Sequence, residues 1–336
     1  MLGGSDPALV AVPTQHESLL GALRVGEQID DDVALVVTTS GTTGPPKGAM
    51  LTAAALTASA SAAHDRLGGP GSWLLAVPPY HIAGLAVLVR SVIAGSVPVE
   101  LNVSAGFDVT ELPNAIKRLG SGRRYTSLVG GPAPRPILDA AAAAGITVVR
   151  TYGMSETSGG CVYDGVPLDG VRLRVLAGGR IAIGGATLAK GYRNPVSPDP
   201  FAEPGWFHTD DLGALESGDS GVLTVLGRAD EAISTGGFTV LPQPVEAALG
   251  THPAVRDCAV FGLADDRLGQ RVVAAIVVGD GCPPPTLEAL RAHVARTLDV
   301  TAAPRELHVV NVLPRRGIGK VDRAALVRRF AGEADQ

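Results

Sequence analysis

The chain has little of what marks secreted or disulfide-stapled proteins. It contains only three cysteines, Cys161, Cys258 and Cys282, which are scattered and lack the spacing of metal ligands. An odd number of isolated cysteines favours a reducing, cytoplasmic compartment with unreactive thiols. The first residues, MLGGSDPALVAVPTQ, have no basic head and no sustained apolar core, so we expect no signal peptide there.

Long apolar runs and an excess of one charge are also missing. The most apolar region, residues 73–99, is interrupted by Pro78, Pro79, His81 and Arg90, so we expect buried core there and no integral membrane protein. The net charge is -5 and the pI is near 5.8, which gives no electrostatic reason to expect nucleic acid or a membrane surface as a partner. The expected partners are small molecules.

What the sequence does contain is an alternation of strand-like and helical runs. Its 336 residues, 46% of them hydrophobic, suffice for two unequal domains with real cores. The strand-like runs 34–37, 146–149 and 171–175 alternate with the alanine-rich runs 51–63 and 137–144. This alternation predicts α/β layers.

The character of the sequence changes near Gly227. Further strands are expected at 259–261, 272–278 and 307–312, with a helix over 287–298 that Thr286 caps. We therefore predict a large domain over residues 1–227 and a smaller α+β domain over residues 228–336.

The loop TTSGTTGPPKGAM, residues 38–50, follows the apolar run 33–37 and carries hydroxyls, glycines and one lysine. These donors suit a polyphosphate. A Walker A loop needs glycine before its lysine and serine or threonine after it, whereas Pro46 precedes Lys47 and Gly48 follows it. The P-loop alternative therefore fails, and a plain polar turn stays the other alternative for the loop taken alone.

Four further motifs occur in order after this loop: TYGMSET (151–157), GWFHTDDLG (205–213), GRADEAISTGGFTVLP (227–242) and PRRGIGKVDR (314–323). With the loop they resemble the adenylate-forming superfamily of acyl-CoA synthetases, peptide-synthetase adenylation domains and luciferases. RIAIGGATLAKGYRNP (180–195) is similar to a strand and turn of that family. The resemblance implies a large layered α/β N-terminal domain, a small mobile α+β C-terminal domain, and the use of ATP, Mg²⁺ and coenzyme A.

The resemblance also implies an ATP site. The β- and γ-phosphates would lie on the loop, adenine against Tyr152, and Mg²⁺ on Glu156, a hard carboxylate suited to that ion. Asp211 and Arg228 would bind the ribose, although Asp210 stands where the family has glycine. The full predicted set is Thr39, Ser40, Gly41, Thr42, Thr43, Gly44, Lys47, Gly131, Tyr152, Gly153, Ser155, Glu156, Asp211, Arg228 and Lys320.

Lys320 resembles the family lysine that bridges the attacking carboxylate and the α-phosphate, which makes it the predicted catalytic residue of adenylation. Asp230 matches the hinge about which the small domain rotates. Gly236 and Gly237 would line the path of the thiol of coenzyme A. The residues around Gly236 and Gly237 depart from the family pattern at Ser234, Phe238 and Pro244.

The acid substrate is indicated by Tyr80, His81 and Arg90 in VPPYHIAGLAVLVRSVIAG, residues 77–95. A catalytic role for His81 and a structural one are both open. An arginine in an apolar helix needs a partner or a ligand if it is buried. The pattern resembles the o-succinylbenzoate-CoA ligases of menaquinone synthesis, whose substrate carries a second carboxylate for Arg90 to bind. A structural ion pair is the alternative for Arg90.

Two stretches of the family are missing. Only 37 residues precede Thr38, so we expect a trimmed large domain, and a homodimer whose second subunit completes the pocket is one arrangement left open. Val129 runs straight into Gly130, where relatives have a helix and a strand, so a missing stretch is expected there. The alternative functions are an acyl- or aryl-CoA synthetase for another acid and a catalytically degenerate adenylate-binding sensor.

Overall fold

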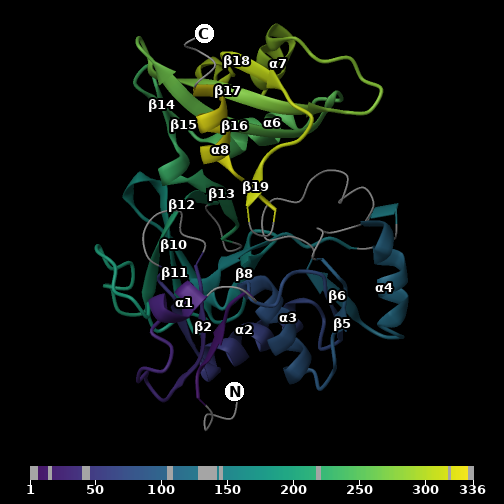
Figure 1. Ribbon diagram of the computed structural model, residues 1–336, viewed down its shortest axis with the longest axis vertical. Coiled ribbons are helices and arrows are strands. Elements are labelled where there is room, and N and C mark those ends of the chain that lie inside the picture. Colours follow the sequence, from purple (N-terminus) through teal and green to yellow (C-terminus); the bar gives the residue numbers. More distant parts are fainter. Residues whose placement is uncertain are drawn as a thin grey trace. The chain divides into compact units, whose positions relative to one another are not determined.

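The structure is a computed structural model that describes residues 7–13, 17–39, 46–103, 109–127, 142–143, 147–216, 221–316 and 319–331. The chain forms two compact units (Figure 1). The first comprises Met1–Val129, Thr147–Thr209 and Leu215–Thr224, and the second comprises Gly130–Ile146, Asp210–Ala214 and Val225–Gln336. The second unit thus takes in Asp210–Ala214, a short segment that lies well before the predicted domain boundary.

The first part of the chain contains short strands and four helices among its described residues. Its helices are α1 (Glu17–Ala22), α2 (Ala53–Arg66), α3 (Ile82–Ile93) and α4 (Leu112–Arg118). Its strands are β1 (Leu9–Ala11), β2 (Val33–Val37), β3 (Ala49–Thr52), β4 (Ser72–Leu75), β5 (Val99–Glu100), β6 (Arg124–Ser127), β7 (Thr151–Met154), β8 (Gly159–Tyr163), β9 (Val166–Pro167), β10 (Val171–Val175), β11 (Arg180–Gly185), β12 (Trp206–Leu215) and β13 (Leu223–Arg228).

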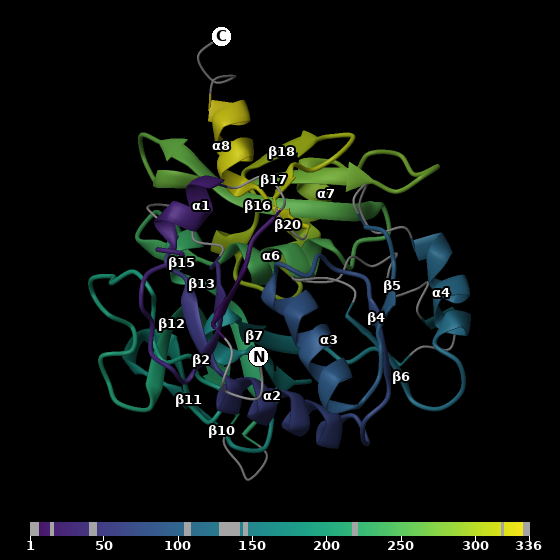
Figure 2. The same cartoon turned by 60° about the horizontal axis from the view of Figure 1, so that its bottom comes forward.

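The α/β layering arises where helices connect parallel strands. Strand β4 pairs in parallel with β5 and with β6, and α3 and α4 form the crossovers that parallel pairing requires. Trp73 and Leu75 of β4 pack against Val87 of α3 in a buried cluster. Figure 2 shows α3 beside β4, and α4 beside β5 and β6. The predicted α/β class of the large domain is confirmed.

The second part of the chain is built on one five-stranded sheet. Its strands run in the order β15-β14-β17-β16, with β18 paired to β17. The elements of this part are β14 (Ile233–Thr235), β15 (Phe238–Val240), α6 (Pro242–Leu249), β16 (Val255–Asp265), β17 (Gly269–Val278), α7 (Leu287–Val294), β18 (Glu306–Val309), β19 (Arg315–Arg316), β20 (Lys320–Val321) and α8 (Arg323–Ala331).

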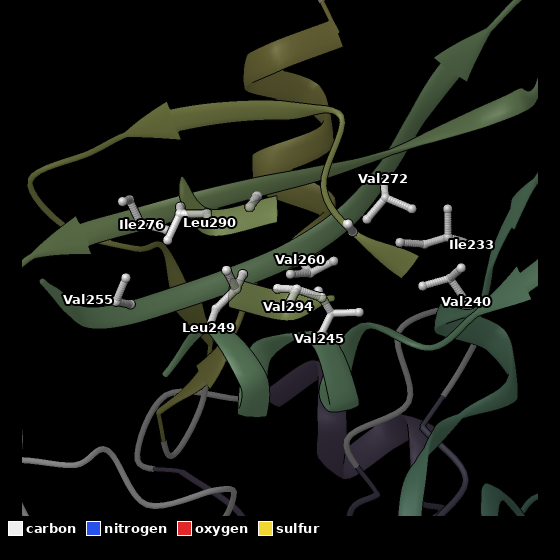
Figure 3. Close-up of a cluster of buried hydrophobic side chains, with 12 residues drawn as sticks. Ile233, Val240, Val245, Leu249, Val255, Val260, Val272, Ile276, Leu290 and Val294 are labelled. Carbon is white, nitrogen blue, oxygen red and sulfur yellow. The ribbon is translucent and has the colours of Figure 1, made fainter. Parts of the chain in front are cut away.

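Both faces of this sheet are covered, which explains the unbroken apolar run of β17. Val272, Ala274 and Ile276 face a core that α6 and α7 complete; Figure 3 shows this cluster. Val273, Ala275 and Val277 face the other side, where the α8 residues Leu326 and Phe330 cover them. Alternate residues of a strand point to opposite faces, so helices lie on both sides of the sheet.

Several expected elements are present with shifted ends. Runs 34–37 and 171–175 are strands, and the strands expected at 259–261, 272–278 and 307–312 correspond to β16, β17 and β18. Helix 51–63 begins instead at Ala53 because Leu51 belongs to β3, and the helix that Thr286 caps ends at Val294. The expected helix 137–144 falls largely outside the described residues.

The expected strand 146–149 is wrong over its described part. Residues 147–150 have no regular structure and are mostly exposed, and the strand begins only at Thr151. The reason is pairing: Thr151 is the first residue to pair with β8, opposite Tyr163. No helix in the described part of the chain is both long and apolar enough to cross a membrane.

Candidate active site

The glycine-rich loop connects β2 to β3. Val37 pairs with Ala49 across these antiparallel strands, which holds the two ends of the loop together. Thr39 and Lys47 lie at those ends, whereas the predicted phosphate ligands Ser40, Gly41, Thr42, Thr43 and Gly44 fall outside the described residues. A P-loop leads directly into a helix; here a strand comes first, so the structure also excludes the P-loop alternative.

The segment that carries Ser155 and Glu156 is buried and held on several sides. It forms the 3-10 helix η2 (Ser155–Thr157) directly after β7. The hydroxyl of Ser155 donates to the carbonyl of Thr38 at 3.3 Å, which joins the segment to the start of the loop. The amide of Ala189 donates to the carbonyl of Glu156 at 2.8 Å. The hydroxyl of Ser158 donates to the carbonyl of Thr187 at 2.8 Å.

Glycine is required at position 153, next to the predicted adenine residue Tyr152. A Cβ added there would lie 2.1 Å from the carbonyl oxygen of Gly159, a distance that no side chain tolerates. Tyr152 pairs with Val162 of β8, and the ladder shifts register between Tyr152 and Gly153. The close approach of the strands thus fixes the backbone that leads into Glu156. Gly131, the other predicted adenine residue, lies outside the described residues.

Glu156 has a partner that the sequence analysis missed. The hydroxyl of Tyr192 donates to Oε1 of Glu156 at 2.6 Å, and Nζ of Lys47 lies 5.4 Å from the centroid of the Tyr192 ring. A single buried carboxylate beside a phosphate loop fits Mg²⁺, which binds one or two carboxylates together with substrate phosphates. Glu156 and Lys47 are 36 and 145 positions away from Tyr192 in sequence, so no local pattern reveals these contacts.

Tyr192 belongs to the segment Lys190–Asn194, which binds the second end of the loop. The amide of Arg193 donates to the carbonyl of Gly48 at 2.7 Å, and that of Asn194 donates to Lys47 at 3.0 Å. The side-chain amide of Asn194 donates to the carbonyl of Pro46 at 2.6 Å. Nζ of Lys190 lies 2.8 Å from a carboxylate oxygen of Asp32. The motif of residues 180–195, expected only to be a strand and turn, therefore also holds the end of the glycine-rich loop by hydrogen bonds.

His81 lies at the N-terminus of α3. Its carbonyl accepts the amide of Leu85 at 2.9 Å, and its ring centroid is 4.7 Å from that of Tyr80. The first turn of α3 packs tightly on the preceding turn, because a Cβ at Gly84 would lie 2.4 Å from the carbonyl oxygen of Pro78. Ala86 of α3 lies near Gly159 of β8: a Cβ added at Gly159 would be 3.3 Å from the Cβ of Ala86. His81 is thus on a helix that packs against β8.

Arg90 lies near the other end of α3, in the core. Only 6% of it is exposed. Its Nη2 donates to the Tyr163 hydroxyl at 2.9 Å, and its guanidinium carbon lies 5.0 Å from the Trp73 ring centroid. Burial lowers the pKa of Arg90. Nine residues of helix separate the backbones of His81 and Arg90 by ~14 Å along the axis and by half a turn around it.

The contacts of Arg90 described above are a hydroxyl and an aromatic ring, and its buried Nε has no hydrogen-bond partner among the described residues. The alternative that the sequence left open was a structural ion pair; the hydrogen-bond partner found here is the neutral hydroxyl of Tyr163. Binding of a second substrate carboxylate by Arg90 stays a prediction.

In the second unit, the predicted ribose and hinge residues lie together. Nη1 of Arg228 is 3.7 Å from Asp211, and Nη2 is 3.6 Å from Asp210. Arg228 also binds Asp230 through two hydrogen bonds of 2.8 Å. Burial opposes ionisation of Asp230, but these hydrogen bonds outweigh it and hold its pKa below the usual range. The Asp211 side chain is 13% exposed and that of Asp210 is 50% exposed, so Asp211 is the better preorganised acceptor.

Lys320 is exposed on the hairpin of β19 and β20, where it pairs with Arg316. The hairpin is fastened to the sheet by Arg315, whose Nη2 lies 2.6 Å from Asp257. Just beyond it, Arg323 binds both oxygens of Glu246, at 2.7 and 2.8 Å. The base of the hairpin is thus fixed while the Lys320 side chain faces solvent.

Gly236 and Gly237 form the two-residue turn between β14 and β15, with φ of 58° and 83°. Two positive φ values are what a tight type I′ hairpin turn requires, and glycine supplies them without strain. A Cβ at Gly237 would meet nothing within 4 Å, so the backbone conformation and not crowding explains that glycine.

Cys161 is fully buried in β8, and burial raises the pKa of its thiol to about 12. A thiol with so high a pKa is not a nucleophile at neutral pH. The expectation of an unreactive thiol agrees with this burial.

Two family profiles match the sequence: that of the AMP-binding enzymes over residues 13–119, and that of the AMP-binding enzyme C-terminal domain over residues 244–320. The chain is also 92% identical to a Mycobacterium tuberculosis protein named "Probable 2-succinylbenzoate-CoA ligase", over 362 residues that cover 100% of the chain and 94% of that protein. The chain belongs to the AMP-binding enzyme family.

More distant relatives of this AMP-binding enzyme are similar over most of its length. The 2-succinylbenzoate-CoA ligase of Geobacillus kaustophilus is 34% identical, with 89% of the chain and 69% of that protein covered. A structure of the o-succinylbenzoate CoA synthetase (MenE) of Bacillus subtilis with the intermediate OSB-AMP is 29% identical, with a TM-score of 0.73 over 88% of the chain and 69% of that structure. The same protein with ATP and a magnesium ion also has a TM-score of 0.73, at 29% identity, over 89% of the chain and 72% of that structure.

The mycobacterial alignment is 362 residues long, whereas this AMP-binding enzyme has 336 residues, all within the alignment. The alignment therefore contains 26 positions, the difference between 362 and 336, at which the relative has a residue and this chain has none. The missing stretch predicted between Val129 and Gly130 lies outside the described residues. The alignment length does not locate the difference, so that position stays a prediction.

Proposed function

We propose that the chain is an AMP-forming acid-CoA ligase that converts 2-succinylbenzoate (o-succinylbenzoate) to its coenzyme A thioester, a step of menaquinone synthesis. One observation carries the proposal: the chain is 92% identical to a probable 2-succinylbenzoate-CoA ligase along its whole length. The Bacillus subtilis structure that contains OSB-AMP, at 29% identity, is consistent with the same substrate.

The first half-reaction is adenylation. A carboxylate oxygen of the acid attacks the α-phosphorus of ATP, the bond to the β-phosphate oxygen breaks, and acyl-AMP and pyrophosphate form. In this proposal Lys47 and the loop hydroxyls stabilise the charge that grows on pyrophosphate, and Ser155 lies beside the loop to bind phosphate oxygen. Lys320 reduces the repulsion between the attacking carboxylate and the α-phosphate.

A bound Mg²⁺ would supply positive charge that neutralises the phosphates. Glu156 is the residue of this chain that would hold it, because its carboxylate is buried and is oriented by Tyr192, whose ring also contacts Lys47. Asp211 accepts hydrogen bonds from the ribose hydroxyls, a use suited to a two-oxygen acceptor. Tyr152 offers its ring face to adenine.

The second half-reaction forms the thioester. The sulfur of coenzyme A attacks the acyl carbon, and the bond to AMP breaks because AMP is a good leaving group. The turn of Gly236 and Gly237, which is open at Gly237, is our candidate for the path of the pantetheine thiol. Asp230 is our candidate for the hinge between the two half-reactions, and its contact with Arg228 would have to change if the backbone rotates there.

ATP, coenzyme A and the acid are the partners in this proposal, and their supply in the cytoplasm is the reason that we assign the protein to that compartment. A homodimer is testable by light scattering of the purified chain.

The direct test of function is a CoA-ligation assay with mass detection of the thioester. We expect o-succinylbenzoate to react with a kcat/KM well above that of medium-chain and aromatic monocarboxylic acids. Equal turnover of monocarboxylates would indicate an acyl- or aryl-CoA synthetase for another acid. Binding of ATP without any acyl-AMP or thioester would indicate the adenylate-binding sensor, a function that has no use for Lys320.

A further inference from the structure

We propose that Tyr192 is a positioning residue that orients the Mg²⁺-binding carboxylate of Glu156 and at the same time holds Lys47 beside it. The inference rests on the proposed function, since it assigns Glu156 to the metal and Lys47 to the phosphates. It assigns a role to a residue that lies in the motif of residues 180–195 but is absent from the predicted site set.

The hydroxyl of Tyr192 is the first of two contacts that carry the proposal. It donates to Oε1 of Glu156 at 2.6 Å, and Glu156 is only 7% exposed. A hydrogen bond to an ionised acceptor is short and about twice as strong as a neutral one. Inside the protein such a bond fixes the rotation of the carboxylate about its last bond.

The ring of Tyr192 makes the second contact. Nζ of Lys47 lies 5.4 Å from the ring centroid, within the range of a cation-π interaction. Lys47 sits immediately after the loop segment that is expected to hold pyrophosphate. One side chain therefore contacts, through different atoms, the predicted metal ligand and the predicted phosphate lysine.

The Tyr192 ring is also held by aromatic neighbours and by backbone contacts with β3. Phe201 contacts it edge-on, with centroids 5.4 Å apart and an interplanar angle of 81°, and Phe207 lies 4.7 Å from Phe201. The Tyr192 backbone bridges to Ala49 at the start of β3. The amide of Met50 donates to the carbonyl of Gly191 at 3.0 Å. Contacts of the Tyr192 ring with Phe201 and of the Tyr192 backbone with β3 thus set the position and direction of the ring.

This arrangement separates two effects that substitutions can remove one at a time. Tyr192→Phe deletes the hydroxyl that orients Glu156 and keeps the ring for Lys47 and Phe201. Tyr192→Leu deletes both. Loss of a group that orients a metal ligand costs about 10- to 100-fold in metal affinity, whereas a purely structural tyrosine would affect metal and nucleotide alike.

The test measures binding and not catalysis. Mn²⁺ titration of the full chain, followed by electron paramagnetic resonance in the presence of ATP and without acid or coenzyme A, gives the metal affinity. Calorimetry with ATP and EDTA gives metal-free nucleotide affinity. We expect Tyr192→Phe to weaken Mn²⁺ binding by about 10-fold and to leave metal-free ATP affinity unchanged. Tyr192→Leu should weaken both.

Tyr125→Phe is the matched control. The Tyr125 hydroxyl donates to the carbonyls of Leu67 and Gly69, at 3.0 and 2.9 Å. This substitution therefore also removes a hydrogen-bonded tyrosine hydroxyl from the same unit, but not one that contacts Glu156. It should lower the melting temperature without changing Mn²⁺ affinity. Glu156→Gln gives the reference value for loss of the metal ligand.

Unchanged Mn²⁺ affinity in folded Tyr192→Phe would overturn the proposal, as would an equal loss of metal and metal-free ATP binding. Wild-type protein that binds Mn²⁺ and ATP but forms no thioester with o-succinylbenzoate would refute the proposed substrate and leave Tyr192 unaffected. Wild-type protein that binds no Mn²⁺ with ATP would refute both.

Discussion

The guanidinium of Arg90 donates a hydrogen bond to the hydroxyl of Tyr163 at 2.9 Å, and both side chains are buried. The carbonyl of Tyr163 accepts a second bond, from Nη2 of Arg66 at 3.0 Å. Arginines of α2 and α3 thus hold the last residue of β8, the strand that pairs with β7 and backs the segment leading to Glu156. Arg90, the residue predicted to bind the substrate, therefore also contacts the strand that supports the predicted nucleotide site.

The two roles of Arg90 can be separated with Tyr163. We expect Arg90→Met and Tyr163→Phe each to lower the unfolding free energy, because either leaves a buried partner unsatisfied at a cost of about 1–3 kcal/mol. We expect the KM values for ATP and for the acid to rise together in both variants. Steady-state kinetics and chemical denaturation provide the measurements.

A selective rise in the KM of o-succinylbenzoate in Arg90→Met, without one in Tyr163→Phe, would instead establish Arg90 as the residue that binds the second carboxylate. Arg66→Met serves as control, since it removes the bond to the Tyr163 carbonyl and leaves Arg90 in place.

Lys320 is predicted to act only in adenylation. Lys320→Ala should reduce formation of acyl-AMP by about 100-fold or more, the cost of removing one charge-stabilising donor, and should leave thioester formation from supplied acyl-AMP intact. Pyrophosphate exchange measures the first half-reaction and a thiolysis assay measures the second.

Arg316→Ala is the control for Lys320, because Arg316 pairs with Lys320 in the same hairpin and is also exposed. It should retain both half-reactions. Equal loss of both in Lys320→Ala would contradict the assigned role.

The sequence predicted the elements whose patterns are local. Val171–Val175 is a strand along its whole predicted length, and Thr286 caps α7 by accepting the amide of Ala289 at 3.2 Å. The four residues of β3 were missed because so short a run, directly before an alanine-rich helix, has no periodicity of its own. The strand expected before Thr151 was wrong because an apolar run does not form a strand without a partner.

The site was predictable to the same extent. Motifs single out Glu156, Asp211 and Lys320 as candidates, and their roles stay predictions, but the contacts of Glu156 and Arg90 join residues far apart in sequence. Tyr192 binds Glu156 from 36 positions away, and Tyr163 binds Arg90 from 73 positions away. Such contacts depend on how strands and helices pack, which a motif does not encode.

His64 makes part of the stability of the first unit depend on pH. It accepts a hydrogen bond from Nε1 of Trp73 at 3.3 Å, a role that only neutral histidine fulfils. Burial, and then the charge of Arg90, lower the pKa of His64 below its usual 6.5. Its contribution to stability is therefore complete above pH 6.5 and is lost as the pH falls through the lowered folded value.

Thermal unfolding between neutral and acidic pH measures this effect. We expect the melting temperature of the wild type to fall more steeply below pH 6.5 than that of His64→Gln. In a Trp206→Phe background the remaining tryptophan, Trp73, should report the same transition by fluorescence. Identical pH profiles of the melting temperature for wild type and His64→Gln would contradict the assigned role of His64.

Asp211, and not Asp210, is expected to bind ribose. Both carboxylates lie within 4 Å of Arg228, but the Asp211 side chain is 13% exposed against 50% for Asp210. An exposed ion pair contributes little, since water screens it. We expect Asp211→Asn to weaken ATP binding by about 10-fold, the loss of a charged hydrogen bond of about 1.5–3 kcal/mol, whereas Asp210→Asn should leave it nearly unchanged.

The ribose contact itself is tested with 2′,3′-dideoxy-ATP. Wild type and Asp210→Asn should prefer ATP over this analogue, because the carboxylate of Asp211 then lacks its hydroxyl partners. Asp211→Asn should bind the two nucleotides with similar affinity, as measured by calorimetry. If Asp211→Asn kept the preference and Asp210→Asn lost it, the ribose would belong to Asp210, the residue that stands where the family has glycine.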